Sequence, residues 1–184
     1  RVLFRSYQEP EAESFNVVRD KDTTAVKVTY RFPQTDARWD ITYKVYSNGV
    51  IKVDNHFVAE NAQTPMIPRV GLRMQLPARI TSLTYYGRGP EENYRDRRTS
   101  QFIGEYTSGI QDMYEPYVRP QENNHRTDIY WCTLTSKAKE GLLFVADRTF
   151  EMNASNYPLE SLDSGDSIEN GSPRTEKTNH RHLR

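Results

Sequence analysis

Acidic side chains gather in two segments that are also rich in asparagine, arginine and tyrosine: Glu91, Glu92, Asp96 and Glu122. Two carboxyl groups held a few ångströms apart can act as a general acid and a general base. Arginines stand close by, however, and charges buried in loops are normally paired. We therefore interpret Glu91 and Glu122 as hydrogen-bond acceptors rather than catalytic groups. Their expected donors are loop amides and one of three arginines: Arg88, Arg97 or Arg126.

The chain contains four histidines: His56, His125, His180 and His182. His180 and His182 alternate, so on a strand their side chains share one face. Such a pair can begin a metal site, but a third ligand is needed and none is evident nearby in the sequence. We therefore favour structural histidines at a domain contact, and predict neither a metal nor a cofactor. His125 stands at a polar loop tip, which indicates a solvent or interface residue.

The single cysteine, Cys132, stands in a predicted strand without an obvious cysteine or histidine partner. An internal disulfide is excluded, and a nucleophilic role is not expected. A lone cysteine fits a reducing compartment, so a cytoplasmic location is favoured. The chain begins with Arg1 rather than Met, which suggests an excised fragment and leaves a leader on the parent protein open.

The balance of charge argues against two classes of partner. Lysine and arginine number 25, aspartate and glutamate also number 25, and the basic residues are scattered. This distribution predicts no nucleic-acid partner. No apolar run is long enough to span a bilayer, so no membrane partner is expected either.

Alternating apolar residues predict strands through much of the chain. Over residues 25–32, valines and aromatics occupy every second position, as on a strand with one buried face. Asn48-Gly49 separates two more alternating runs and is a strong hairpin signal. The remaining predicted strands lie at 39–46, 50–58, 69–76, 83–86, 127–135 and 142–146. Twelve tyrosines in a chain that is only 35% hydrophobic also favour antiparallel β-structure with one wet face.

Two long polar loops, at 86–100 and 114–126, remain between the predicted strands. The first opens with two glycines and a proline within four residues, followed by Glu, Asn, Asp and Arg. These residue types hold a loop rigidly through hydrogen bonds between side chain and backbone. Asn93 and Asn123 are accordingly interpreted as turn residues first and as ligand contacts second.

Three segments, in order, resemble the C-terminal β-sandwich domain of family 2 β-galactosidases, often called the small-chain domain. Residues 86–97 resemble its signature Y-G-R-G-P-x-E-N-Y-x-D-R. Residues 112–123 resemble its segment D-M-Y-x-P-Y-V-x-P-x-E-N, and residues 179–183 resemble its S/N-H-R-H-L. Because three separate motifs match in order, the resemblance is specific.

The resemblance implies an all-β fold, a large antiparallel β-sandwich of the supersandwich type shared with galactose-mutarotase-like domains. The family's domain is longer at both ends, so residues 1–184 are expected to form a single domain truncated at both ends. Missing strands would leave sheet edges or an apolar face uncovered. Self-association of the chain is therefore expected.

The resemblance also implies a non-catalytic C-terminal domain of a β-galactosidase that hydrolyses terminal β-D-galactosides. In that family both catalytic carboxylates belong to a TIM barrel, and this sequence lacks the alternation of strands and helices that a barrel needs. The chain is therefore expected to be inactive alone, to contact other domains of the parent enzyme and to shape the rim of the galactoside pocket. The candidate interface or sugar-rim residues are Arg88, Glu91, Asn93, Arg97, Glu122, Asn123, His125, Arg126, His180 and His182.

Two alternative functions stay open. An aldose epimerase on the same sandwich would use a histidine as general acid, but residues 69–74, where it is expected, contain none. His56 stands one strand too early. A free-standing carbohydrate-binding module could instead use tyrosines and tryptophans as platforms for sugar rings.

Overall fold

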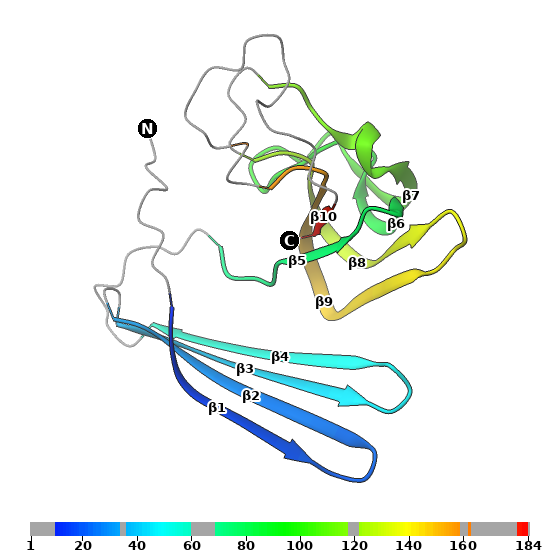
Figure 1. Ribbon diagram of the computed structural model, residues 1–184. Helices are drawn as coiled ribbons and strands as arrows, with labels where there is room; N and C mark the ends of the chain where they lie inside the picture. The colour runs from blue at the N-terminus through cyan, green and yellow to red at the C-terminus, as the bar shows by residue number, and fades with distance from the viewer. Residues whose placement is uncertain are drawn as a thin grey trace. The chain divides into compact units, whose positions relative to one another are not determined.

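The computed structural model describes residues 10–33, 36–59, 69–117, 122–158, 162 and 180–183. By its internal contacts the chain divides into two compact units, with the boundary between Val70 and Gly71. The described elements are β-strands and one short 3₁₀ helix, each unit containing one antiparallel sheet (Figure 1). The predicted all-β class is therefore confirmed. The supersandwich and the single domain over residues 1–184 stay predictions.

The first unit is a meander of four antiparallel strands: β1 (Glu11–Arg19), β2 (Thr23–Phe32), β3 (Ala37–Tyr46) and β4 (Ile51–Ala59). The predicted hairpin at Asn48-Gly49 joins β3 to β4. Gly49 takes a left-handed φ of 86°, and the Asn48 side chain accepts a hydrogen bond from the amide of Val50 at 3.1 Å. Asparagine and glycine suit this turn because both tolerate such backbone angles.

Few side chains of the four-stranded sheet are buried. Val28, Ala37 and Ile41 are the buried hydrophobic residues among the described part of this unit. Val28 stands directly opposite Ile41 in the register of β2 and β3, so their side chains lie on the same face. Every residue of β1 is exposed, and this strand lacks a period-two pattern, which is why its sequence does not predict it.

The second unit contains six strands, in the order β5-β10-β9-β8-β6-β7. Their bounds are β5 (Met74–Pro77), β6 (Ile80–Gly89), β7 (Phe102–Gly109), β8 (His125–Ser136), β9 (Gly141–Ser155) and β10 (His180–Leu183). The 3₁₀ helix η1 (Ile110–Met113) follows β7. Strands β6 and β9 extend well beyond the predicted ranges, and β8 matches its range closely. Strand β5 is shorter than predicted, and the edge strand β7, which contains two glycines, is not predicted at all.

The core of the second unit lies on one face of this sheet, where η1 supplies Ile110 and Met113. Its largest fully buried hydrophobic side chains come from β6, β8 and β9: Leu83, Tyr85, Ile129, Leu134 and Met152. Strands β6 and β8 pair antiparallel, and so do β8 and β9. The end of β6, the start of β8 and the end of β9 therefore lie at the same end of the sheet.

No helix in the described part of the chain is long and apolar enough to cross a membrane.

Candidate functional site

A cluster of buried polar residues lies at the end of the six-stranded sheet where β6 ends, β8 begins and β9 ends. We call it the polar cluster. It comprises residues of three segments: 88–98 at and after the end of β6, 122–128 before and at the start of β8, and 151–156 at the end of β9. Its most deeply buried members are polar or charged, with exposed fractions of 7% or less: Glu92, Asn93, Asn123, Asn124, His125, Arg126, Thr127, Asn153 and Asn156. Polar groups so far from water require partners.

Asn93 is fully buried and uses its whole amide. Its Nδ2 donates to the carbonyl oxygens of Arg88 and Glu91, both at 3.0 Å. Its Oδ1 accepts from the amide of Thr127 at 3.0 Å and from the Thr127 hydroxyl at 2.6 Å. One side chain thus ties the loop after β6 to the start of β8, as predicted for a loop-holding asparagine.

The carboxylate that organises the first loop is that of Glu92, and the prediction for Glu91 is wrong. Glu92 accepts from Arg97 Nη2 at 2.7 Å, from the Tyr117 hydroxyl and from the backbone amide of Asn124. The Glu91 side chain is exposed, and only its backbone takes part, donating to Gln101 Oε1 at 3.0 Å. In an irregular segment, no periodicity indicates which of two adjacent glutamates points inward.

Asp128 and Glu151 are two further carboxylates that sequence reasoning missed. Asp128 accepts from Arg88 Nε at 2.7 Å and from Arg98 at 3.2 Å, and Glu151 accepts from Arg95 Nε at 2.6 Å. These partners lie 40, 30 and 56 residues apart in sequence. The pairs exist only because β8 and β9 bring distant segments together, and no local motif signals them.

His125 is buried at the start of β8 and stacks on the ring of Tyr94 with centroids 5.0 Å apart. The interpretation as a solvent residue at a loop tip is therefore wrong. Its Nδ1 faces Asn153 Oδ1 at 2.9 Å and Glu122 Oε1 at 3.2 Å, and its Nε2 faces Glu151 Oε2 at 3.1 Å. Glu122 thus pairs with a histidine, a partner that the sequence did not predict for it.

The partners of His125 favour its doubly protonated form, because both ring nitrogens face oxygen acceptors. Burial alone would lower the pKa of His125, but hydrogen bonds to Glu122 and Asn153 and the carboxylate charges outweigh it and raise that pKa above 6.5. Burial tends to raise the pKa of Glu151, but Arg95 and His125 together lower it.

Two asparagines directly before β8 bind different segments, Asn123 the second loop and Asn124 strand β9. Asn123 accepts from the amide of Glu115 at 3.0 Å and donates back to the Glu115 carbonyl oxygen, so it binds the backbone eight residues away in sequence. Asn124, which was not among the predicted site residues, has a left-handed φ of 67° and donates to the Ala154 carbonyl oxygen. Asparagine tolerates that φ better than most residues do.

Gly87 and Gly89 lie in β6 and not in a turn, so the predicted start of the loop at residue 86 is wrong. A Cβ on Gly87 would come within 2.9 Å of the Ile129 Cα and 3.0 Å of the Asp128 carbonyl oxygen. A Cβ on Gly89 would come within 2.2 Å of the Tyr85 hydroxyl. The glycines of the signature therefore make room for neighbouring β8 and for a buried tyrosine.

His180 and His182 both lie in β10, as the predicted strand pattern requires, opposite Pro77 and Gln75 of β5. Among the residues that the structure describes, no group of three or more His, Cys, Asp or Glu could hold a metal ion. Cys132 is buried in the core of the second unit, and burial raises the pKa of its thiol to about 12. A thiol with such a pKa is a poor nucleophile near neutral pH.

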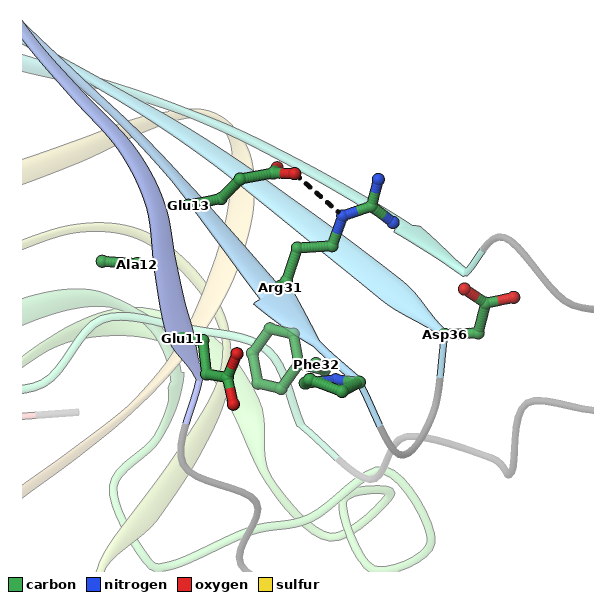
Figure 2. Close-up of a pocket in the computed structure, with 7 residues that line it drawn as sticks. Glu11, Ala12, Glu13, Arg31, Phe32 and Asp36 are labelled. Carbon is green, nitrogen blue, oxygen red and sulfur yellow. Dashed lines mark hydrogen bonds and ion pairs between the residues drawn. The ribbon is translucent and has the colours of Figure 1, made fainter.

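The four-stranded unit carries a surface pocket of about 390 Å³ that contains none of the predicted site residues (Figure 2). Glu11, Glu13, Arg31 and Asp36 supply its charged groups, and Phe32 is among its apolar ones. Arg31 Nε lies 3.3 Å from Glu13 Oε1, and both side chains are well exposed. This solvated ion pair is typical of a sheet edge and needs no ligand.

Comparison with known proteins agrees with the motifs. Residues 4–181 match the family model described as the β-galactosidase small chain. The β-galactosidase of Priestia megaterium is 32% identical over 158 residues, which are 86% of this chain and 15% of that relative. That of Streptococcus thermophilus is 31% identical over 76% of this chain and 14% of its own length, and that of Lactococcus lactis is 39% identical over 47% and 8%. The chain thus spans about one seventh or less of these relatives, and it belongs to the β-galactosidase small chain family.

Proposed function

We propose that the chain is a non-catalytic domain of a β-galactosidase that hydrolyses terminal β-D-galactosides, supporting the catalytic barrel and the rim of the sugar pocket. The relatives that it matches carry the name β-galactosidase, and the chain corresponds to a small share of their length. The catalytic carboxylates would then lie in the rest of the enzyme, and this chain would hold loops against it.

The observation that carries the proposal is the internal use of the carboxylates in the polar cluster. Glu92, Asp128 and Glu151 each accept hydrogen bonds from an arginine, and Glu92 also accepts from a backbone amide. A retaining glycosidase needs one carboxylate free to attack the sugar and another free to protonate the leaving group. Carboxylates occupied by arginines suit the fixing of loop conformation instead.

The proposal is tested by assaying o-nitrophenyl β-galactoside hydrolysis in three samples. These are the chain alone, the remainder of the β-galactosidase alone, and the two together. We expect no hydrolysis by the chain alone and a marked rise in activity or heat resistance when both parts are combined. Hydrolysis by the purified chain that is abolished by a substitution of Glu92 or Glu151 would contradict the proposal.

A second candidate, a carbohydrate-binding surface, is supported by two neighbouring tyrosines. The rings of Tyr86 and Tyr130 lie 5.3 Å apart, and the residues are 38% and 48% exposed. Exposed aromatic faces can stack on sugar rings. Titration with galactose and lactose, followed by tyrosine fluorescence, tests this candidate, with Tyr130→Ala as the control. The epimerase alternative gains no support from His56, which is exposed in β4.

A further inference from the structure

Arg126 differs from the other arginines of the polar cluster in its partners. Arg88 and Arg98 lie against Asp128, Arg97 against Glu92, and Arg95 against Glu151, with nitrogen–oxygen distances of 2.6–3.2 Å. These four side chains are 24–82% exposed. Arg126 is 4% exposed and has no carboxylate within ion-pair distance among the described residues. The most deeply buried of these cations is thus the one without a counter-charge.

The contacts that Arg126 does make are with neutral oxygens. Its Nε donates to the Tyr85 hydroxyl and its Nη1 to the His125 carbonyl oxygen, both at 3.1 Å. The Tyr85 hydroxyl donates in turn to the Pro90 carbonyl oxygen. Burial raises the pKa of Tyr85 although Arg126 opposes this, so the phenol is neutral at ordinary pH. Of the five N–H groups of the guanidinium, three remain for another acceptor.

A buried charge without a counter-charge is costly, and proteins normally pair it. Glu91 is the local alternative, because its carboxylate lies near enough to contribute to the raised pKa of Tyr85. However, its side chain is exposed and forms no ion pair with Arg126.

We propose that Arg126 binds a carboxylate supplied by another domain or subunit of the assembled β-galactosidase. This inference rests on the proposed function. The guanidinium presents a planar fork that matches a carboxylate with two parallel hydrogen bonds, and such a partner neutralises the charge. A galactoside is uncharged, so its hydroxyl groups could fill the hydrogen bonds but would leave the charge uncompensated. A carboxylate therefore suits the site better than the sugar does.

The experiment uses the intact β-galactosidase that contains this chain, with Arg126→Met, Arg126→Lys and a control, Arg148→Met. Arg148 is an exposed residue of β9. Loss of Arg126 would leave the proposed partner carboxylate buried without a counter-charge. We therefore expect Arg126→Met to raise the rate of thermal inactivation at least about tenfold. Arg126→Lys, which keeps the charge without the fork, should lie between Arg126→Met and the wild type. Arg148→Met should stay within about twofold of the wild type.

A structure of the assembled enzyme supplies the second measurement, which does not depend on how the variants fold. We expect an Asp or Glu oxygen from outside residues 1–184 within hydrogen-bond distance of Arg126 Nη1 or Nη2. The proposal is overturned if that oxygen belongs to Glu91, if Arg126→Met inactivates no faster than Arg148→Met, or if Arg126→Met changes only the KM for o-nitrophenyl β-galactoside. Activity of the unmodified assembly tests the proposed function separately.

Discussion

The four-stranded sheet and the polar cluster use the same kinds of charged side chains in different surroundings. In the sheet, Arg38 lies 3.0 Å from Asp40 and Lys44 lies 3.9 Å from Asp54, and all four side chains are 32–46% exposed. In the cluster, the Glu92 side chain is 3% exposed and also holds a backbone amide. Exposed pairs are screened by water, whereas a buried acceptor leaves its donors unsatisfied when it is lost. The burial of an ion pair therefore decides its contribution to stability more than the distance between its nitrogen and oxygen atoms does.

The largest effect is expected for Glu92→Ala. This substitution removes the acceptor of Arg97, Tyr117 and the Asn124 amide together, and leaves a buried N–H unpaired. We expect the free energy of unfolding to fall by about 3 kcal/mol. Urea unfolding followed by Trp131 fluorescence in a Trp39→Phe background measures it in the six-stranded unit. Glu91→Ala is the matched control, and an equal loss for both variants would contradict the assignment of Glu92.

Gly87→Ala tests the close approach of β6 and β8. A Cβ there would contact backbone atoms of Ile129 and Asp128, which cannot move aside as a flexible side chain can. We expect a loss of about 2 kcal/mol from overpacking. Gly71→Ala serves as the control because no atom lies within 4 Å of its Cβ position, and its loss should be below about 0.5 kcal/mol. Similar melting temperatures for the two variants would show that a Cβ at position 87 fits between β6 and β8 without overpacking.

The stability that the polar cluster contributes should depend on pH, because His125 and Glu151 have shifted pKa values in the folded state. The pKa of His125 is raised in the folded state, so its stabilising contribution is complete below the unfolded value of 6.5 and is lost as the pH rises through the folded value. The pKa of Glu151 is lowered, so its contribution is lost as the pH falls through a value below 4.5. His125→Gln should therefore flatten the decline in stability above pH 6.5.

Urea midpoints at about pH 5.5 and about pH 8.5 measure that decline. His56→Gln is the control, because His56 is exposed in β4 of the four-stranded sheet. If the wild type and His125→Gln lose stability equally between the two pH values, His125 is not protonated through its carboxylate partners.

The smallest effect is expected for Arg38→Ala in the four-stranded sheet. Arg38 is 43% exposed, and Asp40 keeps its hydrogen bond from the Thr29 hydroxyl at 2.7 Å. The loss should be within about 0.5 kcal/mol. Arg97→Ala in the cluster should cost about 1 kcal/mol, because Arg97 is exposed but its acceptor Glu92 is buried. Calorimetry on both variants ranks them, and the opposite order would refute the comparison.

Much of the sheet structure could be predicted because its signals are local. The alternation over residues 25–32 and the Asn48-Gly49 turn each depend on neighbours in sequence, and both appear in the structure. Strand β1 escapes prediction because all its residues are exposed and no buried face imposes a pattern. Its place is set by pairing with β2, which leaves no trace in its own composition.

The polar cluster could be predicted only in part. Its motifs indicate a rigid loop and identify Asn93, Asn123 and Arg97 as members. The choice of Glu92 over Glu91, and the roles of Asp128 and Glu151, depend on how β8 pairs with β6 on one side and with β9 on the other. Tertiary pairing of this kind is not encoded in residue spacing. The burial of His125 was missed for the same reason, since two of its partners, Asn153 and Glu151, are 28 and 26 residues away.

The sequence separation of the contacts in the polar cluster also bears on the order of folding. Asn93 reaches Thr127 over 34 residues, and Arg95 reaches Glu151 over 56. Such contacts close large loops, and we expect these to form only after β8 has paired with both β6 and β9. The cluster should therefore be among the last parts of the six-stranded unit to assemble. Interactions that form after the rate-limiting step of folding slow unfolding without speeding folding. We therefore expect the polar cluster to lengthen the lifetime of the native state by lowering the unfolding rate.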